Sequence, residues 1–321
     1  MSSPIFIVGS GRSGTSLLRA LLNAHRDIHL GQESGLFRWA GRWPDLDGAG
    51  FLEAWSRSPS GALFNPEPVQ LAPGAPKREA IAAVLQARAA RFGKTRWGDK
   101  TPLHALHLAE IQAAFPQARV VAVVRHPVAT VSSLGRVCWS SGSALADSWM
   151  VRQAWEALQA SPLPLYTLRL ERLLADPEPA LRALLSFLEA PWDPRVLEHH
   201  LHADFDADPR LPWLVGAEKP LRPYVPGPVA LTPAQVALVE AVIPPQTMGY
   251  APWQHPAGVS RVGTVLQELG RAVGFGLRAA AGRPSLDPAR LDAAEGLRWL
   301  WSLNPRSPPP QGLVDQTLLR H

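Results

Sequence analysis

Apolar runs and helical stripes alternate along the first part of this chain. Residues 4–8 form a short apolar run rich in β-branched side chains, which is typical of a fully buried strand. A turn with three glycines follows, and leucines then recur at helical spacing at positions 17, 18, 21 and 22. The pattern predicts a strand, a glycine-rich turn and a helix at the N-terminus.

The same alternation continues to about residue 250. Further strands are expected at residues 28–30, 96–102, 120–124 and 165–170. Helices are expected at residues 79–92, 103–115, 128–137, 144–160, 179–188 and 232–242. The last of these opens with a capping box from Thr232 to Gln235. Strands that alternate with helices predict an α/β fold with a central, mainly parallel sheet covered on both faces.

Two regions depart from this pattern. Residues 39–77 are irregular and rich in Trp, Pro and Gly, and a long irregular stretch in a compact domain is usually functional. The character changes again beyond Tyr250, where residues 252–256 have the composition of a linker. We therefore expect one domain at residues 1–250 and a C-terminal helical extension at residues 251–321.

The extension carries an apolar face. Val262, Leu266, Leu269 and Val273 share one side of an expected helix, a second helix is expected near 291–303, and residues 305–310 are rich in proline. Two interpretations stay open. In the first, the helices pack against the sheet or against a second subunit, and the latter would give a homodimer. In the second, they contact a membrane surface.

Composition and charge indicate which partners the protein could bind. The 321 residues are 46% hydrophobic, which supports a sizeable core. The net charge of +5 and the pI of about 9.9 suit a protein that binds a polyanionic nucleotide. The charges are dispersed, so nucleic acid is not an expected partner. The single cysteine, Cys138, excludes an internal disulfide. Together with the absence of a signal-like or membrane-spanning run, it predicts a cytoplasmic location.

The glycine-rich turn is the main candidate for chemistry. Gly9 and Gly14 have the spacing of a Walker A motif, but Thr15 and Ser16 follow where that motif has lysine and then Ser or Thr. Arg12 supplies a cation inside the turn instead. A buried strand, a glycine-rich turn and a helix can close backbone N–H groups on an anion. The pattern favours a nucleotide other than an ordinary magnesium triphosphate, and a turn without a ligand is the alternative.

Residues 6–34, FIVGSGRSGTSLLRALLNAHRDIHLGQES, resemble the 5′-phosphosulfate loop of sulfotransferases that use 3′-phosphoadenosine 5′-phosphosulfate (PAPS). The nearest likeness is to the branch that contains the tyrosylprotein sulfotransferases and many bacterial relatives. The resemblance implies a three-layer P-loop sulfotransferase-like fold. It also implies a 5′-phosphosulfate cradle made by Gly11, Arg12, Ser13, Gly14, Thr15 and Ser16.

Three further segments match the family in order. Residues 31–33 resemble a Gly-Glu-Glu segment whose second glutamate is the general base; this assigns Glu33, which lies close to the cradle if its strand neighbours the first one. Residues 99–102 resemble the segment that brings a lysine to the leaving group, here Lys100. Residues 120–134 resemble the 3′-phosphate motif, here Arg125 and Ser133. Gln32 and Leu170 depart from the pattern, since the family has glutamate and usually tyrosine there.

The resemblance implies in-line transfer of the sulfuryl group from PAPS to a hydroxyl acceptor, with PAP as product and no metal. Glu33 would be the base, Lys100 and Arg12 would stabilise charge, and residues 39–77 would form a lid on the acceptor side. A sugar, lipid, phenol or tyrosine could be the acceptor. Alternatives are a P-loop kinase, a nucleotide-binding protein without sulfuryl transfer, and a histidine base, because the cytosolic branch of the superfamily uses histidine. The candidates for that base are His104, His107 and His126.

Overall fold

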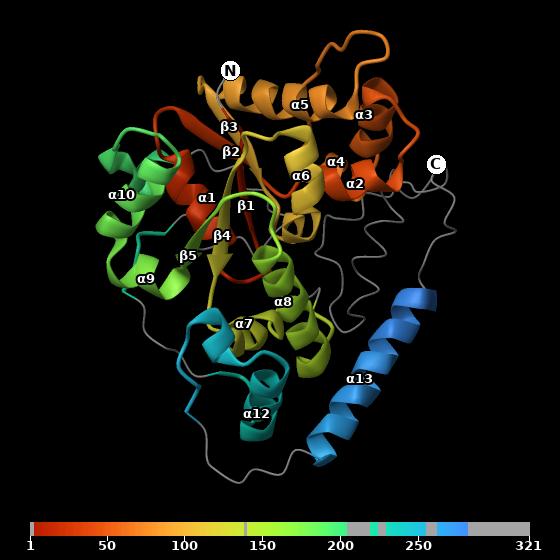
Figure 1. Ribbon diagram of the computed structural model, residues 1–321, viewed down its shortest axis with the longest axis vertical. Helices are drawn as coiled ribbons and strands as arrows, with labels where there is room; N and C mark the ends of the chain where they lie inside the picture. The colour runs from red at the N-terminus through yellow and green to blue at the C-terminus, as the bar shows by residue number, and fades with distance from the viewer. Residues whose placement is uncertain (1–2, 138–139, 204–218, 224–228, 255–261, 282–321) are drawn as a thin grey trace. The chain divides into compact units, whose positions relative to one another are not determined.

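The computed structural model describes residues 3–137, 140–203, 219–223, 229–254 and 262–281. Its centre is a five-stranded sheet with the order β2-β3-β1-β4-β5, and every neighbouring pair in it is parallel. The strands are β1 (Ile5–Gly9), β2 (Ile28–Gly31), β3 (Arg96–Lys100), β4 (Arg119–Val124) and β5 (Leu165–Arg169). This arrangement confirms the predicted α/β class (Figure 1).

The register brings the carboxyl ends of the strands to one edge. Ile7 of β1 pairs with Lys100 of β3, and Gly31 of β2 pairs with Asp99 of β3. The strand before Glu33 does not neighbour β1, because β3 lies between β2 and β1. Glu33 is therefore next to the end of β3, and the lysine of β3 separates it from the glycine-rich turn.

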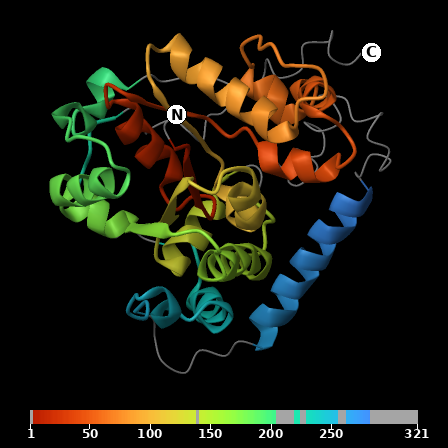
Figure 2. The same cartoon turned by 45° about the horizontal axis from the view of Figure 1, so that its top comes forward.

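Helices cover both faces of the sheet. On one face Ile5, Ile7 and Val121 pack with leucines of α1 (Thr15–Asn23), α9 (Leu170–Ala175) and α10 (Pro177–Phe187). On the other, Phe6 meets Phe37 of α2 (Leu36–Arg42) and Phe115, which follows α6 (Leu108–Ala114). Figures 1 and 2 show α1 and α10 together on one side of the strands. Successive residues of a strand face opposite ways, so each strand feeds both layers.

Residues 39–77 are more regular than expected. They contain the end of α2, then α3 (Gly48–Ser56), α4 (Pro59–Phe64) and the start of α5 (Lys77–Arg91). The side chains of Asp47 and Ser58 cap α3 and α4 by accepting from the backbone N–H groups of Gly50 and Gly61. Pro and Gly divide this region into helices too short to show a helical period, which is why an irregular stretch was the wrong prediction. The longest part of this region without a helix is residues 65–76, and shorter linkers lie at 43–47 and 57–58.

The expected helix at residues 103–115 is also divided. A 3₁₀ helix, η1 (Pro102–His107), follows β3 directly, and the α-helix α6 begins at Leu108. The remaining elements are η2 (Pro194–Val196), α11 (His199–His202), η4 (Pro245–Met248), α7 (Pro127–Leu134), α8 (Ala144–Gln159), α12 (Pro233–Val242) and α13 (Val262–Ala281). The predicted capping box of α12 is present, with Thr232 and Gln235 bonded reciprocally.

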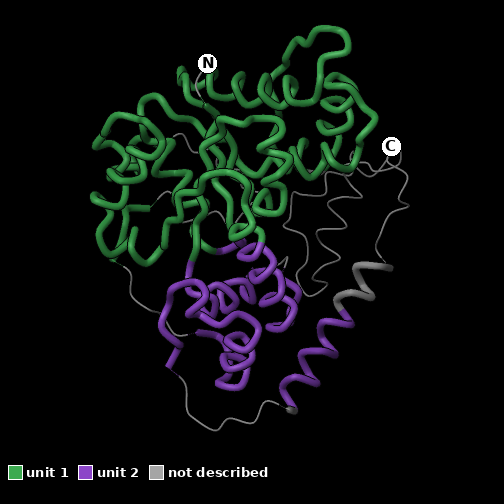
Figure 3. Tube along the Cα trace, viewed as in Figure 1, with its two compact units in different colours: residues 1–9, 13–124, 157–225 green, residues 10–12, 125–156, 226–321 purple. Residues whose placement is uncertain are grey.

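The chain divides into two compact units, coloured in Figure 3. Unit 1 contains residues 1–9, 13–124 and 157–225, and therefore the whole sheet; unit 2 contains residues 10–12, 125–156 and 226–321. Cys138, the helix expected near 291–303 and the tail at 305–310 lie outside the described residues. The domain boundary expected at residue 250 stays a prediction.

Within unit 2, α13 is held by its one acidic residue. The buried carboxylate of Glu268 accepts from the backbone N–H of Ala144, at the start of α8, at 2.6 Å, and from the Gln235 side chain of α12 at 2.9 Å. Leu266, Leu269 and Val273 share the predicted face and are exposed. None of the described helices combines the length and apolarity that crossing a membrane requires.

Candidate functional site

Two positions of the turn after β1 strongly favour glycine. Gly9 has φ +148°, and a Cβ atom there would lie 2.4 Å from the carbonyl oxygen of Val123. Gly14 has φ +103°, and a Cβ atom there would lie 2.7 Å from Leu170 Cδ1. Both backbone conformations are in the region that favours glycine. Leu170, which stands where the family usually has tyrosine, thus packs against the turn.

The N-terminus of α1 lies at the end of this turn. Gly14 is its N-cap and has no side chain that could accept from the first N–H groups, and the first turn contains no acidic residue. Free N–H groups at the positive end of a helix dipole attract anions. Ser13 and Thr15 are buried beside them. Within unit 1, residues 13–16 therefore have the features of an anion cradle.

Lys100 and Glu33 form an ion pair beside this cradle. Lys100 Nζ lies 2.6 Å from Glu33 Oε1 and donates to Ser16 Oγ at 3.2 Å. The lysine side chain is completely buried, whereas the glutamate side chain is 46% exposed. Sequence reasoning placed these three residues in one site, and the structure brings them into contact.

Burial sets the electrostatics of Lys100. Loss of water around the ammonium lowers the pKa of Lys100, and the negative charge of Glu33 partly opposes this effect. A buried cation with one carboxylate and one hydroxyl as partners is well placed to accept a second anionic ligand. The exposed carboxylate of Glu33 can meet a molecule that arrives from solvent.

A buried network, which the sequence did not predict, joins the neighbours in sequence of Lys100 and Glu33. Asp99, fully buried, accepts hydrogen bonds through Oδ2 from the hydroxyls of Ser34 at 2.9 Å and Thr101 at 2.8 Å. His104 Nδ1 lies 3.1 Å from the same oxygen. The only sequence signal was position: Ser34 follows Glu33, and Asp99 and Thr101 flank Lys100.

Gln32 has a structural explanation for its departure from the family pattern. Its side chain is buried, and its amide donates to the carbonyl oxygen of Leu63 at 3.2 Å. A carboxylate at this position would be a buried charge that cannot donate to that carbonyl. The neutral amide suits the contact with the end of α4.

Unit 2 holds the other predicted site residues in a second group. Arg12, in a left-handed conformation with φ +66°, donates from Nε to Ser133 Oγ of α7 at 3.3 Å. Arg125 donates from Nη1 to the carbonyl oxygen of Arg12 at 3.3 Å. Arg125 Nε is buried and has no hydrogen-bond acceptor among the described residues. Two guanidinium groups and a hydroxyl are therefore adjacent, with one buried donor available for an anion.

The three candidate histidines are engaged elsewhere. His104 Nε2 accepts from the backbone N–H of Phe37 at 3.4 Å while Nδ1 faces Asp99. His126 Nδ1 accepts from the backbone N–H of Val128 at 3.2 Å, and Nε2 lies 3.0 Å from the carbonyl oxygen of Ala251. His107 contacts Glu110 through Nδ1 at 3.3 Å. Both ring nitrogens of His126 have partners, and the His104 ring is buried with Nε2 bonded to a backbone N–H, so neither is placed to take a proton from a substrate.

The described residues contain no group of three or more His, Cys, Asp or Glu side chains arranged to hold a metal ion. The positive charge near the cradle comes from lysine and arginine.

Known proteins resemble much of this chain. Residues 4–194 match the model of the sulfotransferase family. Protein-tyrosine sulfotransferase A of Caenorhabditis elegans is 26% identical over 214 residues, and protein-tyrosine sulfotransferase 1 of Danio rerio is 29% identical over 215. Each alignment covers 61% of this chain, which spans 52% and 55% of those two relatives, about half of their length. A solved sulfotransferase domain, from the Synechococcus PCC 7002 olefin synthase, has a TM-score of 0.49 and 20% identity over 78% of this chain and 97% of its own.

Proposed function

Because the chain belongs to the sulfotransferase family, we propose that it transfers the sulfuryl group of PAPS to a hydroxyl acceptor. The family match and the tyrosine sulfotransferase relatives confirm the family and branch that the glycine-rich turn resembles. The donor, the roles of individual residues and the acceptor are proposals. The observation that carries them is the contact of Lys100 with both Glu33 and Ser16.

The residues present suit the two charged ends of PAPS. The uncapped N-terminus of α1 and the hydroxyls of residues 13, 15 and 16 suit a phosphosulfate, and the buried Lys100 adds a cation. In unit 2, Arg125 Nε has no acceptor in the part of the chain that the structure describes, and together with Ser133 and Arg12 it suits a phosphate monoester such as the 3′-phosphate.

The proposed reaction is a direct displacement at sulfur. The acceptor oxygen forms a new bond to sulfur while its proton passes to the Glu33 carboxylate. The bond between sulfur and the bridging oxygen breaks, and its electron pair stays on the 5′-phosphate of PAP. Lys100 neutralises that developing charge by donating from Nζ, and Arg12 is assigned a similar role on the donor oxygens. Positioning and electrostatics provide the catalysis.

The ion pair has a consequence for this mechanism. In the free protein Lys100 Nζ donates to Glu33 Oε1. When the lysine turns to the donor's oxygens, Glu33 Oε1 is released and can accept from the hydroxyl of the acceptor. This favours activation of the acceptor after the donor has bound.

The acceptor is proposed only as a class. The relatives are named protein-tyrosine sulfotransferases, so a phenolic hydroxyl such as that of tyrosine is our first candidate. Sugars, lipid head groups and small phenols remain to be compared with it in one screen.

Calorimetric titration with PAP and with ATP-Mg tests the donor class, and transfer of ³⁵S from labelled PAPS to tyrosine peptides, phenols, glycosides and lipids tests the chemistry. We expect binding of PAP, loss of that binding in Arg125→Ala, and labelling of one acceptor class. Preference for ATP-Mg would replace this proposal with a P-loop kinase. That alternative is less well supported because Thr15 stands where the kinase motif has lysine.

A further inference from the structure

The two catalytic candidates lie next to residues that share one buried acceptor. Ser34 follows Glu33, Asp99 precedes Lys100, and Thr101 follows it. Ser34 and Thr101 both donate to Asp99 Oδ2, at 2.9 and 2.8 Å, and His104 Nδ1 lies 3.1 Å from it. All contacts lie within unit 1. One carboxylate oxygen thus joins the segment after β2 to the end of β3.

Backbone groups extend this connection. The N–H of Gly35 donates to Thr101 Oγ1 at 3.2 Å, and the N–H of Leu36 donates to Ser34 Oγ at 3.3 Å. The N–H of Phe37 donates to His104 Nε2 at 3.4 Å. The backbone N–H groups of the three residues after Ser34 therefore donate to side chains that bond or face Asp99. The same segment is also held by Trp55 Nε1, which donates to the carbonyl oxygen of Ser34 at 2.9 Å, and by the Gln32 side chain.

Strand geometry explains how this network can act on the reacting pair. Asp99 and Lys100 are successive residues of β3, so their side chains point to opposite faces of the sheet. Asp99 bonds Ser34 on one face, while Lys100 bonds Glu33 on the other. Fixing residues 34 and 99 to each other fixes the distance between residues 33 and 100.

We propose that Asp99 is the positioning residue of this site, which holds Glu33 against Lys100 through Ser34, Thr101 and His104. The proposal rests on the proposed function, since it assigns the pair its roles. His104 has a defined part in it. Nε2 accepts from the backbone N–H of Phe37, and Nδ1 lies 3.1 Å from Asp99 Oδ2, so the ring lies between the carboxylate and the segment after Ser34.

The kinetic test compares Asp99→Ala with Asp99→Asn. Alanine removes the shared acceptor, whereas asparagine keeps one oxygen for the same donors. We expect Asp99→Ala to lower kcat about 10- to 100-fold with the KM for PAPS unchanged within twofold, because a small misplacement of reacting groups is costly. Asp99→Asn should recover most of kcat.

The matched control is Asp193→Asn. Asp193 is also a buried aspartate in unit 1, but it bonds Arg195 and makes no hydrogen bond to Glu33 or Lys100 in the part of the chain that the structure describes. It should lower Tm and leave kcat and KM unchanged. If Asp99→Ala behaves like this control, or if the KM for PAPS rises together with the loss of kcat, Asp99 is only a structural residue and the proposal is overturned. The same holds if Asp99→Asn is no better than Asp99→Ala.

Amide hydrogen exchange gives a second test that needs no acceptor. Asp99→Ala should speed exchange at Gly35, Leu36 and Phe37, while exchange at the β1 amides stays slow. Unchanged exchange at residues 35–37 would overturn the proposal even if turnover cannot be measured. Wild-type protein that binds no PAP and transfers no ³⁵S would instead overturn the proposed function, so the two failures are distinct.

Discussion

Lys100 Nζ and Glu33 Oε1 are 2.6 Å apart, and only the glutamate of the pair is open to solvent. The cation is built into the sheet at the end of β3, and the carboxylate reaches it from the turn after β2. This asymmetry suits two different roles. Lys100 is placed to contact the buried leaving group, and Glu33 is placed to contact the acceptor's hydroxyl as it arrives from solvent. The first two predictions separate those roles.

Lys100→Met should abolish transfer without loss of stability. Burial of the ammonium is unfavourable and lowers the pKa of Lys100, and methionine fills a similar volume without a charge. We expect kcat to fall by about 100-fold or more while Tm stays the same or rises. Thermal unfolding and ³⁵S transfer on the same preparations provide the measurement. A large drop in Tm would mean that the ion pair is needed for folding.

Glu33→Gln should leave PAP affinity unchanged and lower kcat by about 10²- to 10⁴-fold, because the amide is nearly isosteric but cannot take the acceptor's proton. Calorimetry and single-turnover transfer measure the two quantities. His107→Gln is the comparison, since His107 is the candidate histidine whose ring is least enclosed. Retained turnover in Glu33→Gln with loss in His107→Gln would reverse the assignment of the base.

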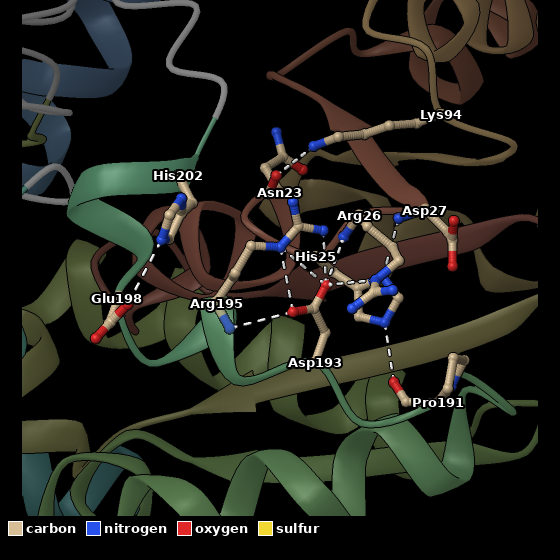
Figure 4. A network of polar contacts seen from close by, with 10 residues as sticks. All are labelled: Asn23, His25, Arg26, Asp27, Lys94, Pro191, Asp193, Arg195, Glu198 and His202. Carbon is tan, nitrogen blue, oxygen red and sulfur yellow. Dashed lines mark hydrogen bonds and ion pairs between the residues drawn. The ribbon is translucent and has the colours of Figure 1, made fainter.

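Stability at low pH should depend on Asp193. Burial by itself raises the pKa of Asp193, but hydrogen bonds from Arg195 and Arg26 outweigh it and hold the pKa well below the ordinary value. Figure 4 shows this carboxylate between the two arginines, with Asp193 Oδ2 accepting from Arg195 Nη2 at 2.8 Å and from the Arg26 backbone at 2.9 Å. The network joins the α1–β2 turn to the segment before η2.

A depressed pKa in the folded state stabilises the protein above the unfolded pKa and loses that effect as pH falls through the folded value. Asp193→Asn should therefore lower stability by about 2 kcal/mol at neutral pH. The difference from wild type should shrink once pH falls below about 4, the ordinary pKa of aspartate. Urea unfolding at several pH values measures it; a difference independent of pH would exclude the charge as the cause.

Gly9 and Gly14 should differ in how much stability is lost when each is replaced by alanine. Gly9→Ala places Cβ against the backbone oxygen of Val123, which cannot move without β4, so we expect a loss of at least about 2 kcal/mol. Gly14→Ala meets only the end of the Leu170 side chain. Its cost should be smaller and should fall further in Gly14→Ala/Leu170→Ala. Chemical denaturation of the variants tests this, and equal costs for Gly9→Ala and Gly14→Ala would contradict it.

Sequence reasoning found the ends of the strands and the residues on them because apolar runs and glycine turns are local signals. The family resemblance then assigned site residues at these ends: Glu33, Lys100 and Ser16, which the structure brings together, and Arg12, Arg125 and Ser133, which it groups in unit 2. Their chemical roles and the cytoplasmic location stay predictions. Strand order could not be predicted, because it depends on which distant strands pair.

The Asp99 network was missed for a related reason. Its bonds depend on how the turn after β2 folds back towards β3, between residues 65 positions apart. The short helices of residues 39–77 were missed because capping by Asp47 and Ser58, not a long apolar stripe, defines them. Both features result from side-chain hydrogen bonds, which the spacing of hydrophobic residues along the sequence does not predict.

Glu268 also bears on where the chain can be shortened. A truncated protein that ended at residue 250 would lose the carboxylate that accepts from the first N–H of α8 and from the side chain of Gln235. Because the exposed apolar face of α13 favours aggregation, this helix is an obvious segment to delete when the protein is expressed. Keeping Glu268 and changing Leu266 or Leu269 to a polar residue would improve solubility while leaving the N-termini of α8 and α12 satisfied.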